Sequence, residues 1–78
     1  MIKVRILTPE WSREFEADAI FLPGELGEFE VLVNHAPIIS TLTAGTVKWR
    51  LGECAESLQI RGGVVRLKDN VMSVCAEV

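Results

Sequence analysis

The chain has 78 residues, of which 49% are hydrophobic and 24% are charged, and its formal net charge is −3. This length predicts one domain, residues 1–78, with enough apolar side chains for a core without metal or disulfides. The acidic balance argues against nonspecific nucleic-acid binding and against docking on anionic lipid, because both need a basic face. No run approaches the ~18 apolar residues of a membrane span, and no signal peptide is evident. We therefore expect a cytosolic chain without direct lipid insertion.

Alternating apolar and polar residues predict short strands at the start of the chain. Residues 2–6 alternate cleanly, which is typical of an edge or surface strand, and Thr8-Pro9-Glu10 ends the run. Residues 14–21 alternate next, and their apolar positions fall two apart, which disfavours a helix. The apolar side of this second run comprises Phe15, Ala17, Ala19 and Phe21.

Residues 22–37 contain two of the three prolines and the only histidine. Pro23-Gly24 and Gly27 indicate turns, because proline presets φ and glycine tolerates positive φ. Residues 28–33 alternate, which predicts a half-buried strand with Phe29 on its apolar side. Asn34-His35-Ala36-Pro37 then breaks the strand.

The second half of the chain repeats this pattern. Residues 38–42 form a short apolar segment, and further alternating runs follow at residues 47–51, 58–61, 65–68 and 72–78. Turn residues separate them at Gly52-Glu53, Gly62-Gly63 and Asp69-Asn70. Strands this short and numerous must close on themselves or pack as two sheets. The sequence therefore predicts an all-β fold, a flattened antiparallel sandwich or barrel of about ten short strands in two sheets.

The residues form no catalytic, metal-binding or nucleotide-binding set. One histidine and two cysteines cannot build a four-ligand zinc site, and reduced thiols are the favoured interpretation of Cys54 and Cys75. His35 is the only neutral-pH base, and a loop histidine that caps backbone groups is the favoured interpretation. Glu28 and Glu30 share one face of a strand, which fits a solvated acidic face. We therefore expect no enzyme activity and no cofactor, and partner binding is what remains.

At residues 22–37 the sequence resembles the epsilon subunit of F-type ATP synthases. Leu22-Pro23-Gly24 matches the family's proline-glycine loop, residues 27–32 match its G-E-[LF]-x-[IV]-L segment, and His35-Ala36-Pro37 matches its H-A-P. Further matches follow the family's order at residues 4–10, 42–47, 60–65 and 70–77. These matched segments, in the same order as in the family, extend over the whole chain. Glu30 departs from the pattern, because the family usually has glycine there.

The resemblance implies a ten-stranded sandwich in the rotor's central stalk. Such a subunit packs against the gamma subunit and rests on the polar loops of the c-subunit ring, helping to couple ion flow to ATP synthesis. It lies peripherally on the cytoplasmic face of the bacterial inner membrane, or on the equivalent side of an organelle. Glu28 matches the family's loop glutamate, and His35 with Pro37 shapes the adjacent loop. The ring-facing residues that the resemblance implies are Glu25, Gly27, Glu28, Glu30, His35, Ala36 and Pro37.

Family members normally continue into a C-terminal helical hairpin that inhibits ATP hydrolysis and in some binds ATP. The sequence ends at Val78, so we expect neither property here. One alternative is a lipoyl or biotinyl carrier domain, because Lys68 stands beside the turn Asp69-Asn70. Another is a β-sandwich adaptor with no rotor role. Self-association of the isolated domain through an exposed edge strand stays open.

Overall fold

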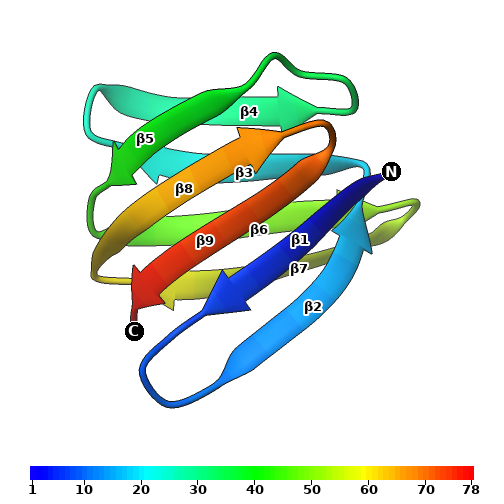
Figure 1. Ribbon diagram of the computed structural model, residues 1–78. Helices are drawn as coiled ribbons and strands as arrows, with labels where there is room; N and C mark the ends of the chain where they lie inside the picture. The colour runs from blue at the N-terminus through cyan, green and yellow to red at the C-terminus, as the bar shows by residue number, and fades with distance from the viewer.

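The computed structural model describes all 78 residues, and its regular structure consists of nine β-strands (Figure 1). The strands are β1 Ile2–Leu7, β2 Ser12–Ala17, β3 Ala19–Gly24, β4 Gly27–Leu32, β5 Ile38–Leu42, β6 Gly45–Leu51, β7 Cys54–Ile60, β8 Gly62–Lys68 and β9 Val71–Glu77. The all-β prediction is confirmed, with nine strands in place of about ten. No helix long and apolar enough to cross a membrane is present.

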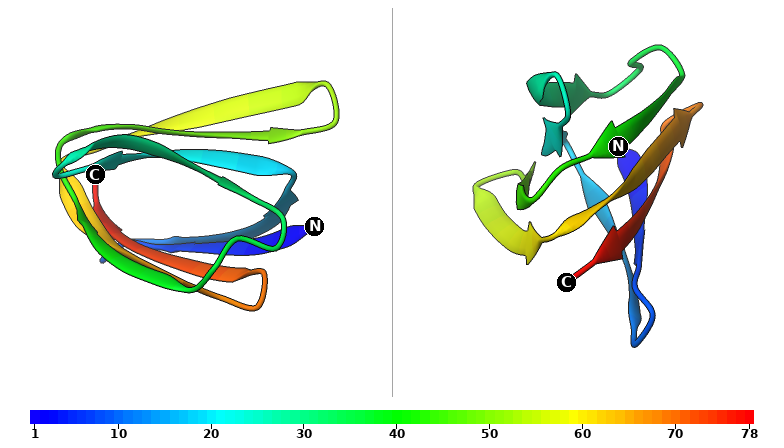
Figure 2. Two further views of the ribbon diagram at one scale, coloured as in Figure 1. Left: turned by 90° about the horizontal axis from the view of Figure 1, so that it is seen from above. Right: turned by 90° about the vertical axis from the view of Figure 1, so that its left-hand side faces the viewer.

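The strands form one hydrogen-bonded path that folds back on itself as two layers. The path runs β2-β1-β9-β8-β5-β3-β6-β7, and β4 pairs with β3 beside it. Only one residue pair, Gly24 with Leu42, joins β3 to β5, and the sheet bends there. The layers are thus β2-β1-β9-β8-β5 and β4-β3-β6-β7, seen from above in Figure 2. This confirms the predicted two-sheet arrangement.

The pairing of β1 with β9 is parallel, so the prediction of a wholly antiparallel sandwich is wrong at this pair. No hairpin joins the first and last strands, so their direction is not constrained by a short turn. The same pairing places β1 between β2 and β9, so of the predicted edge or surface strand at residues 2–6 the edge alternative is wrong. The outward side chains of β1 are exposed, as in a surface strand. The edge of this layer is β2.

The core lies between the layers and is entirely apolar. Alternate residues face inward along strands such as β1, β8 and β9, as period-two patterning requires, and no polar or charged residue is buried. The inward side chains of one layer include Ile2, Val4, Ile6, Val65, Leu67, Met72 and Val74, and those of the other include Ile20, Leu22, Val31, Val47 and Trp49. The two sets form a single buried cluster, so the sandwich is held together by hydrophobic packing.

A corner at Asp18 divides the run that the sequence predicts as one strand. The Asp18 N–H donates to the Arg50 carbonyl at 2.7 Å, and its carboxylate accepts from the Gly52 N–H at 2.7 Å. Beyond this corner Ile20 is buried while Phe21 is half-buried, the reverse of the predicted alternation. Asp18 fits the polar position of a continuous strand, so the alternation does not reveal the corner.

Turn predictions succeed at Asp69-Asn70 and fail at two glycine-containing pairs. Asp69 and Asn70 have φ of 51° and 61°, as a tight two-residue hairpin requires. Pro23-Gly24 lies inside β3, and the turn follows it at residues 25–26. Gly62-Gly63 opens β8, and the break falls at Arg61. At both failures the glycine permits close packing of strands.

The open side of the sandwich is closed by contacts between β2 and the strands β6 and β7. The rings of Phe15 and Trp49 stack with centroids 4.5 Å apart and an interplanar angle of 23°. The Arg13 guanidinium carbon lies 5.4 Å and 5.5 Å from the two ring centroids. Arg13 Nη2 also donates to the two carboxylate oxygens of Glu56, at 2.9 Å and 3.1 Å. These contacts join strands from both ends of the sheet path.

We predict a pH-dependent contribution from this ion pair. The hydrogen bond from Arg13 holds the pKa of Glu56 below its usual 4.5. The pair therefore stabilises the fold above that value, and this stabilisation is lost as the pH falls through the lower folded pKa. The difference in free energy of unfolding between wild type and Glu56→Gln should be largest near neutral pH and vanish in acid. Glu53→Gln, which removes the same charge from the adjacent turn, is the control, and a difference that persists in acid would contradict the prediction.

Two adjacent glycines in β8 provide a matched test of packing. A Cβ on Gly63 would lie 3.1 Å from the Ala76 Cα and would collide with the backbone of β9, whereas one on Gly62 meets only the Leu42 carbonyl at 3.5 Å. Gly63→Ala should therefore lower the free energy of unfolding by ~1–3 kcal/mol. Gly62→Ala should change it by less than about 0.5 kcal/mol. Urea denaturation measures both free energies of unfolding. Equal effects of the two substitutions would show that the close approach of β8 and β9 does not prevent a side chain at residue 63.

Candidate interaction surface

The residues that sequence analysis singles out lie along β4 and at its two ends, and we call residues 25–37 the β4 rim. β4 pairs only with β3, so its other edge is free. Glu25 lies in the turn before β4, whereas residues 35–37 follow the strand. At about 3.3 Å per residue, six strand residues separate these ends by roughly 20 Å. The candidates therefore form an extended rim instead of one loop.

The turn that begins the rim depends on two glycines. Gly24 and Gly27 face each other across residues 25–26. A Cβ on Gly24 would lie 2.8 Å from Cε1 of Phe29 and 2.9 Å from the Gly27 carbonyl oxygen. Gly27 itself has a φ of 127°, which side-chain-bearing residues rarely adopt. The tight turn leaves Glu25 exposed and Leu26 fully in solvent.

The rim carries carboxylates that nothing in the chain neutralises. Glu28 lies opposite Pro23 and Glu30 lies opposite Phe21, and both are exposed on the outer face of β4. The two ion pairs of the structure, Arg5–Glu14 and Arg13–Glu56, include none of the rim residues. The prediction of a solvated acidic face is confirmed. Because these carboxylates are unpaired, they are available to a cationic partner.

Apolar side chains accompany the carboxylates, and sequence analysis missed them. A groove between the start of the rim and β5 is lined by Phe29, Ile39 and Val64 together with Glu25 and Glu28. Ile39 is 72% exposed. Strict alternation along β5, with Leu42 buried, could have revealed Ile39 as outward-facing. The groove therefore combines apolar contact area with negative charge.

At the far end of the rim, His35 contacts its own loop. Its backbone N–H donates to the Leu32 carbonyl at 3.2 Å. Its Nδ1 lies 2.8 Å from the Ala36 carbonyl oxygen, and since a carbonyl only accepts, this contact requires the proton on Nδ1. The structure therefore agrees with a histidine that caps backbone groups. Ala36 and Pro37 are exposed beside it.

A pair of asparagines fixes this end of the rim to the β8–β9 hairpin. The Asn34 N–H donates to Oδ1 of Asn70 at 2.6 Å, and Nδ2 of Asn70 donates to Oδ1 of Asn34 at 2.9 Å. The Asn70 carbonyl accepts from the Lys3 N–H at 2.8 Å. Asn34 has a φ of 67°, which asparagine tolerates better than most residues. Two residues 36 positions apart thus hold the backbone immediately before His35.

No group of three or more His, Cys, Asp and Glu side chains is placed to hold a metal ion. Cys54 at the start of β7 and Cys75 in β9 are free and exposed, in agreement with the prediction of reduced strand thiols. What the rim offers chemically is therefore carboxylates, an apolar groove and ordered backbone.

The whole chain matches known proteins. A family model described as "ATP synthase, Delta/Epsilon chain, beta-sandwich domain" matches residues 1–78. The ATP synthase epsilon chain of Leptospira interrogans (serovar copenhageni) is 38% identical over 77 residues, covering 97% of this chain and 61% of the relative. The chloroplastic epsilon chain of Chlamydomonas reinhardtii is 39% identical over 84 residues, covering 96% and 58%. The chain thus spans about three fifths of the length of these relatives.

Solved structures show the same fold. A chain in the central stalk/c-ring structure of Tetrahymena thermophila mitochondrial ATP synthase superposes with a TM-score of 0.84 at 16% identity, covering 99% of this chain and 63% of that chain. A chain in the OSCP/F1/c-ring structure of the Euglena gracilis enzyme gives 0.89 at 20% identity, covering 96% and 49%. At these sequence identities, the structural similarity shows a shared fold and nothing further.

We predict that the asparagine pair orders the His35 end of the rim. Asn34→Gly, Asn70→Gly and the double variant keep the positive φ at both positions, so a double-mutant cycle isolates the hydrogen bond from Nδ2 of Asn70 to Oδ1 of Asn34. The coupling should be ~1 kcal/mol in free energy of unfolding. Amide exchange at residues 34–36 should accelerate in Asn70→Gly, which removes the acceptor of the residue-34 N–H, while exchange in β8 and β9 stays slow. Additive single variants, with unchanged exchange in Asn70→Gly, would contradict the prediction.

Proposed function

The chain belongs to the β-sandwich domain family of ATP synthase delta/epsilon chains, and on that basis we propose that it is a non-catalytic central-stalk subunit of an F-type ATP synthase. The observation that carries this proposal is the family match over residues 1–78. In this role the chain binds the gamma subunit and the c-subunit ring and helps couple ion flow to ATP synthesis. It is then a peripheral part of a membrane-bound complex, on the cytoplasmic face of the bacterial inner membrane or the equivalent organelle side.

The β4 rim is the surface that we assign to the ring. Its carboxylates at Glu25, Glu28 and Glu30 have no partner within the chain, and the family resemblance implies ring loops that carry arginine. One exposed ion pair contributes only ~0.2–1 kcal/mol. Stable contact therefore needs several pairs together with apolar burial, which the exposed Leu26 and Ile39 supply. The charges then act mainly on orientation and specificity.

The core suits a subunit that transmits torque. Sixteen buried side chains form one cluster between the two layers, and no buried side-chain polar atom lacks a partner. Close-packed interiors of this kind have low compressibility. A load applied at the rim is therefore passed through the sandwich with little deformation.

Neither alternative function gains support from a specific observation. Lys68 ends β8, and the tip of its hairpin is Asp69-Asn70, whereas the carrier interpretation needs the lysine in the turn itself. The intact mass of protein from its native host would reveal a carrier modification. A β-sandwich adaptor outside the rotor would fail to co-purify with the gamma subunit. A stable one-to-one complex with purified gamma subunit is the result that supports the central-stalk proposal.

We predict that Glu28→Lys weakens coupling. The substitution replaces attraction to a cationic ring loop by repulsion of similar size, so ring binding should weaken on the order of tenfold. ATP-driven proton pumping per ATP hydrolysed should fall in vesicles that contain the enzyme reconstituted with the variant. Glu53→Lys makes the same charge change in the β6–β7 turn, away from the rim, and should pump as wild type does. Circular dichroism checks that both variants fold. Unchanged pumping by a folded Glu28→Lys variant would show that Glu28 does not contribute to a contact with the ring, and would contradict the assignment of the rim.

A further inference from the structure

The outer face of β1, β9 and β8 carries a cluster of cations although the chain is net acidic. Strand register places Lys3 and Lys68 on either side of Val71, and places Arg5 and Arg66 on either side of Ser73. Neighbouring strands lie about 4.8 Å apart, so the two cations of each row stand roughly 10 Å apart. We call these residues the basic face: Lys3, Arg5, Arg66, Lys68, Val71 and Ser73.

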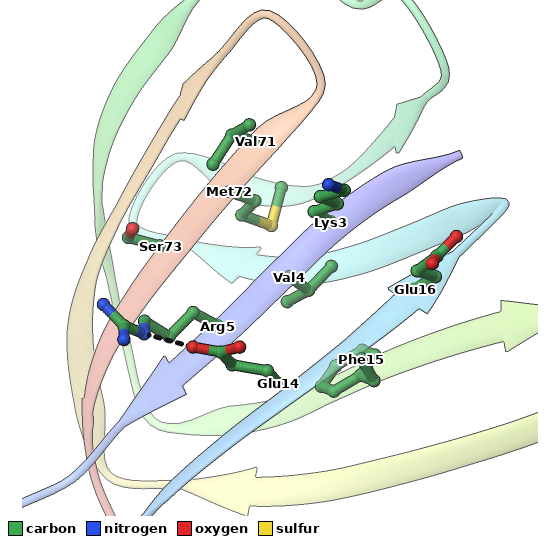
Figure 3. Close-up of a pocket in the computed structure, with 9 residues that line it drawn as sticks. All are labelled: Lys3, Val4, Arg5, Glu14, Phe15, Glu16, Val71, Met72 and Ser73. Atoms are coloured by element: carbon green, nitrogen blue, oxygen red, sulfur yellow. Dashed lines mark hydrogen bonds and ion pairs between the residues drawn. The ribbon is translucent and has the colours of Figure 1, made fainter.

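Only one of these cations has an ion-pair partner. Arg5 Nε lies 2.9 Å from Oε1 of Glu14 on β2, as Figure 3 shows. Lys3, Arg66 and Lys68 take part in neither ion pair of the structure. The β8 half of the basic face is therefore positive and unneutralised.

The basic face also exposes apolar side chains. Val71 is 54% exposed at its centre, and Val64 and Ile39 border it at 41% and 72%. Cations around apolar area complement a protein surface that presents carboxylates around an apolar centre. The face carries no aromatic side chain on which nucleic-acid bases could stack.

We propose that the basic face is a second docking surface, which binds a protein partner through carboxylates placed around an apolar centre. The inference rests on the proposed function, in which this partner is the gamma subunit. The basic face lies on the layer β2-β1-β9-β8-β5, whereas β4 belongs to the other layer, so the two partners dock mainly on different layers of the sandwich. Ile39 and Val64 lie between the two surfaces, because they also line the groove at the start of the rim. Opposite charge on the two surfaces disfavours docking of either partner on the wrong side.

The test is the affinity of purified gamma subunit for the chain and for two charge-matched double variants. Arg66→Glu with Lys68→Glu reverses the unpaired half of the basic face. Lys48→Glu with Arg50→Glu makes the same charge change on exposed positions of β6, on the outer face of the other layer. The first double variant should bind about ten- to a hundredfold more weakly, mainly through slower association at low salt. The second should bind within about threefold of wild type, because Lys48 and Arg50 lie outside the basic face, on the other layer.

The outcomes separate this inference from the function on which it rests. If wild type forms no complex with gamma subunit, both the proposed function and the assignment of this partner are contradicted. If wild type binds and both double variants bind equally well or lose affinity equally, the function stands and the basic face is not the docking surface. Binding of the chain to vesicles of phosphatidylglycerol and phosphatidylcholine, lost in the Arg66→Glu/Lys68→Glu variant, would show a lipid surface instead and overturn the protein assignment.

Discussion

The close approach of backbones at Pro23 and Gly24 determines how the two layers are joined. Leu42 of β5 pairs with Gly24 at the single position where one layer meets the other. The space where Gly24 would carry a Cβ is filled by the Phe29 ring and the Gly27 carbonyl, and a Cβ on Gly45 would lie 2.8 Å from the Pro23 Cβ. Without side chains at these glycines, the sheet can bend sharply while β3 keeps its pairing with β4 on one side and β6 on the other. The free edge of β4, and with it the whole rim, follows from this bend.

Period-two alternation was enough to predict the fold class, because every buried residue of the sheet is apolar and strands such as β1 and β9 alternate without interruption. It could not locate the corner at Asp18, since an aspartate suits the outward position of a strand as well as a corner. It also could not reveal that β1 pairs with β9 in parallel, because that pairing joins the two ends of the chain and no turn between them sets a direction.

The resemblance proposes residues for the candidate site, and the structure adds their arrangement. The resemblance pointed to residues 25–37, and the structure spreads them along a free strand edge with the His35 loop at the far end. The anchoring of that loop by Asn70 is a contact between residues 36 apart, which a local motif does not contain. Likewise the basic face exists only after register brings Lys3 opposite Val71 and Val71 opposite Lys68. In the sequence these cations are dispersed among acidic residues and the net charge is negative.

The acidic β4 rim and the basic face belong to different layers of the sandwich, so their charges favour different partners. Exposed ion pairs contribute little affinity individually, so neither the rim nor the basic face would hold a partner by charge alone. Both surfaces instead combine charge with exposed apolar side chains, Leu26 and Ile39 at the rim and Val71 on the basic face. Apolar burial supplies the affinity of such contacts, and charge sets the orientation in which they form. A small sandwich without a catalytic group can in this way act as an oriented connector, because its apolar core keeps the two surfaces at a constant separation.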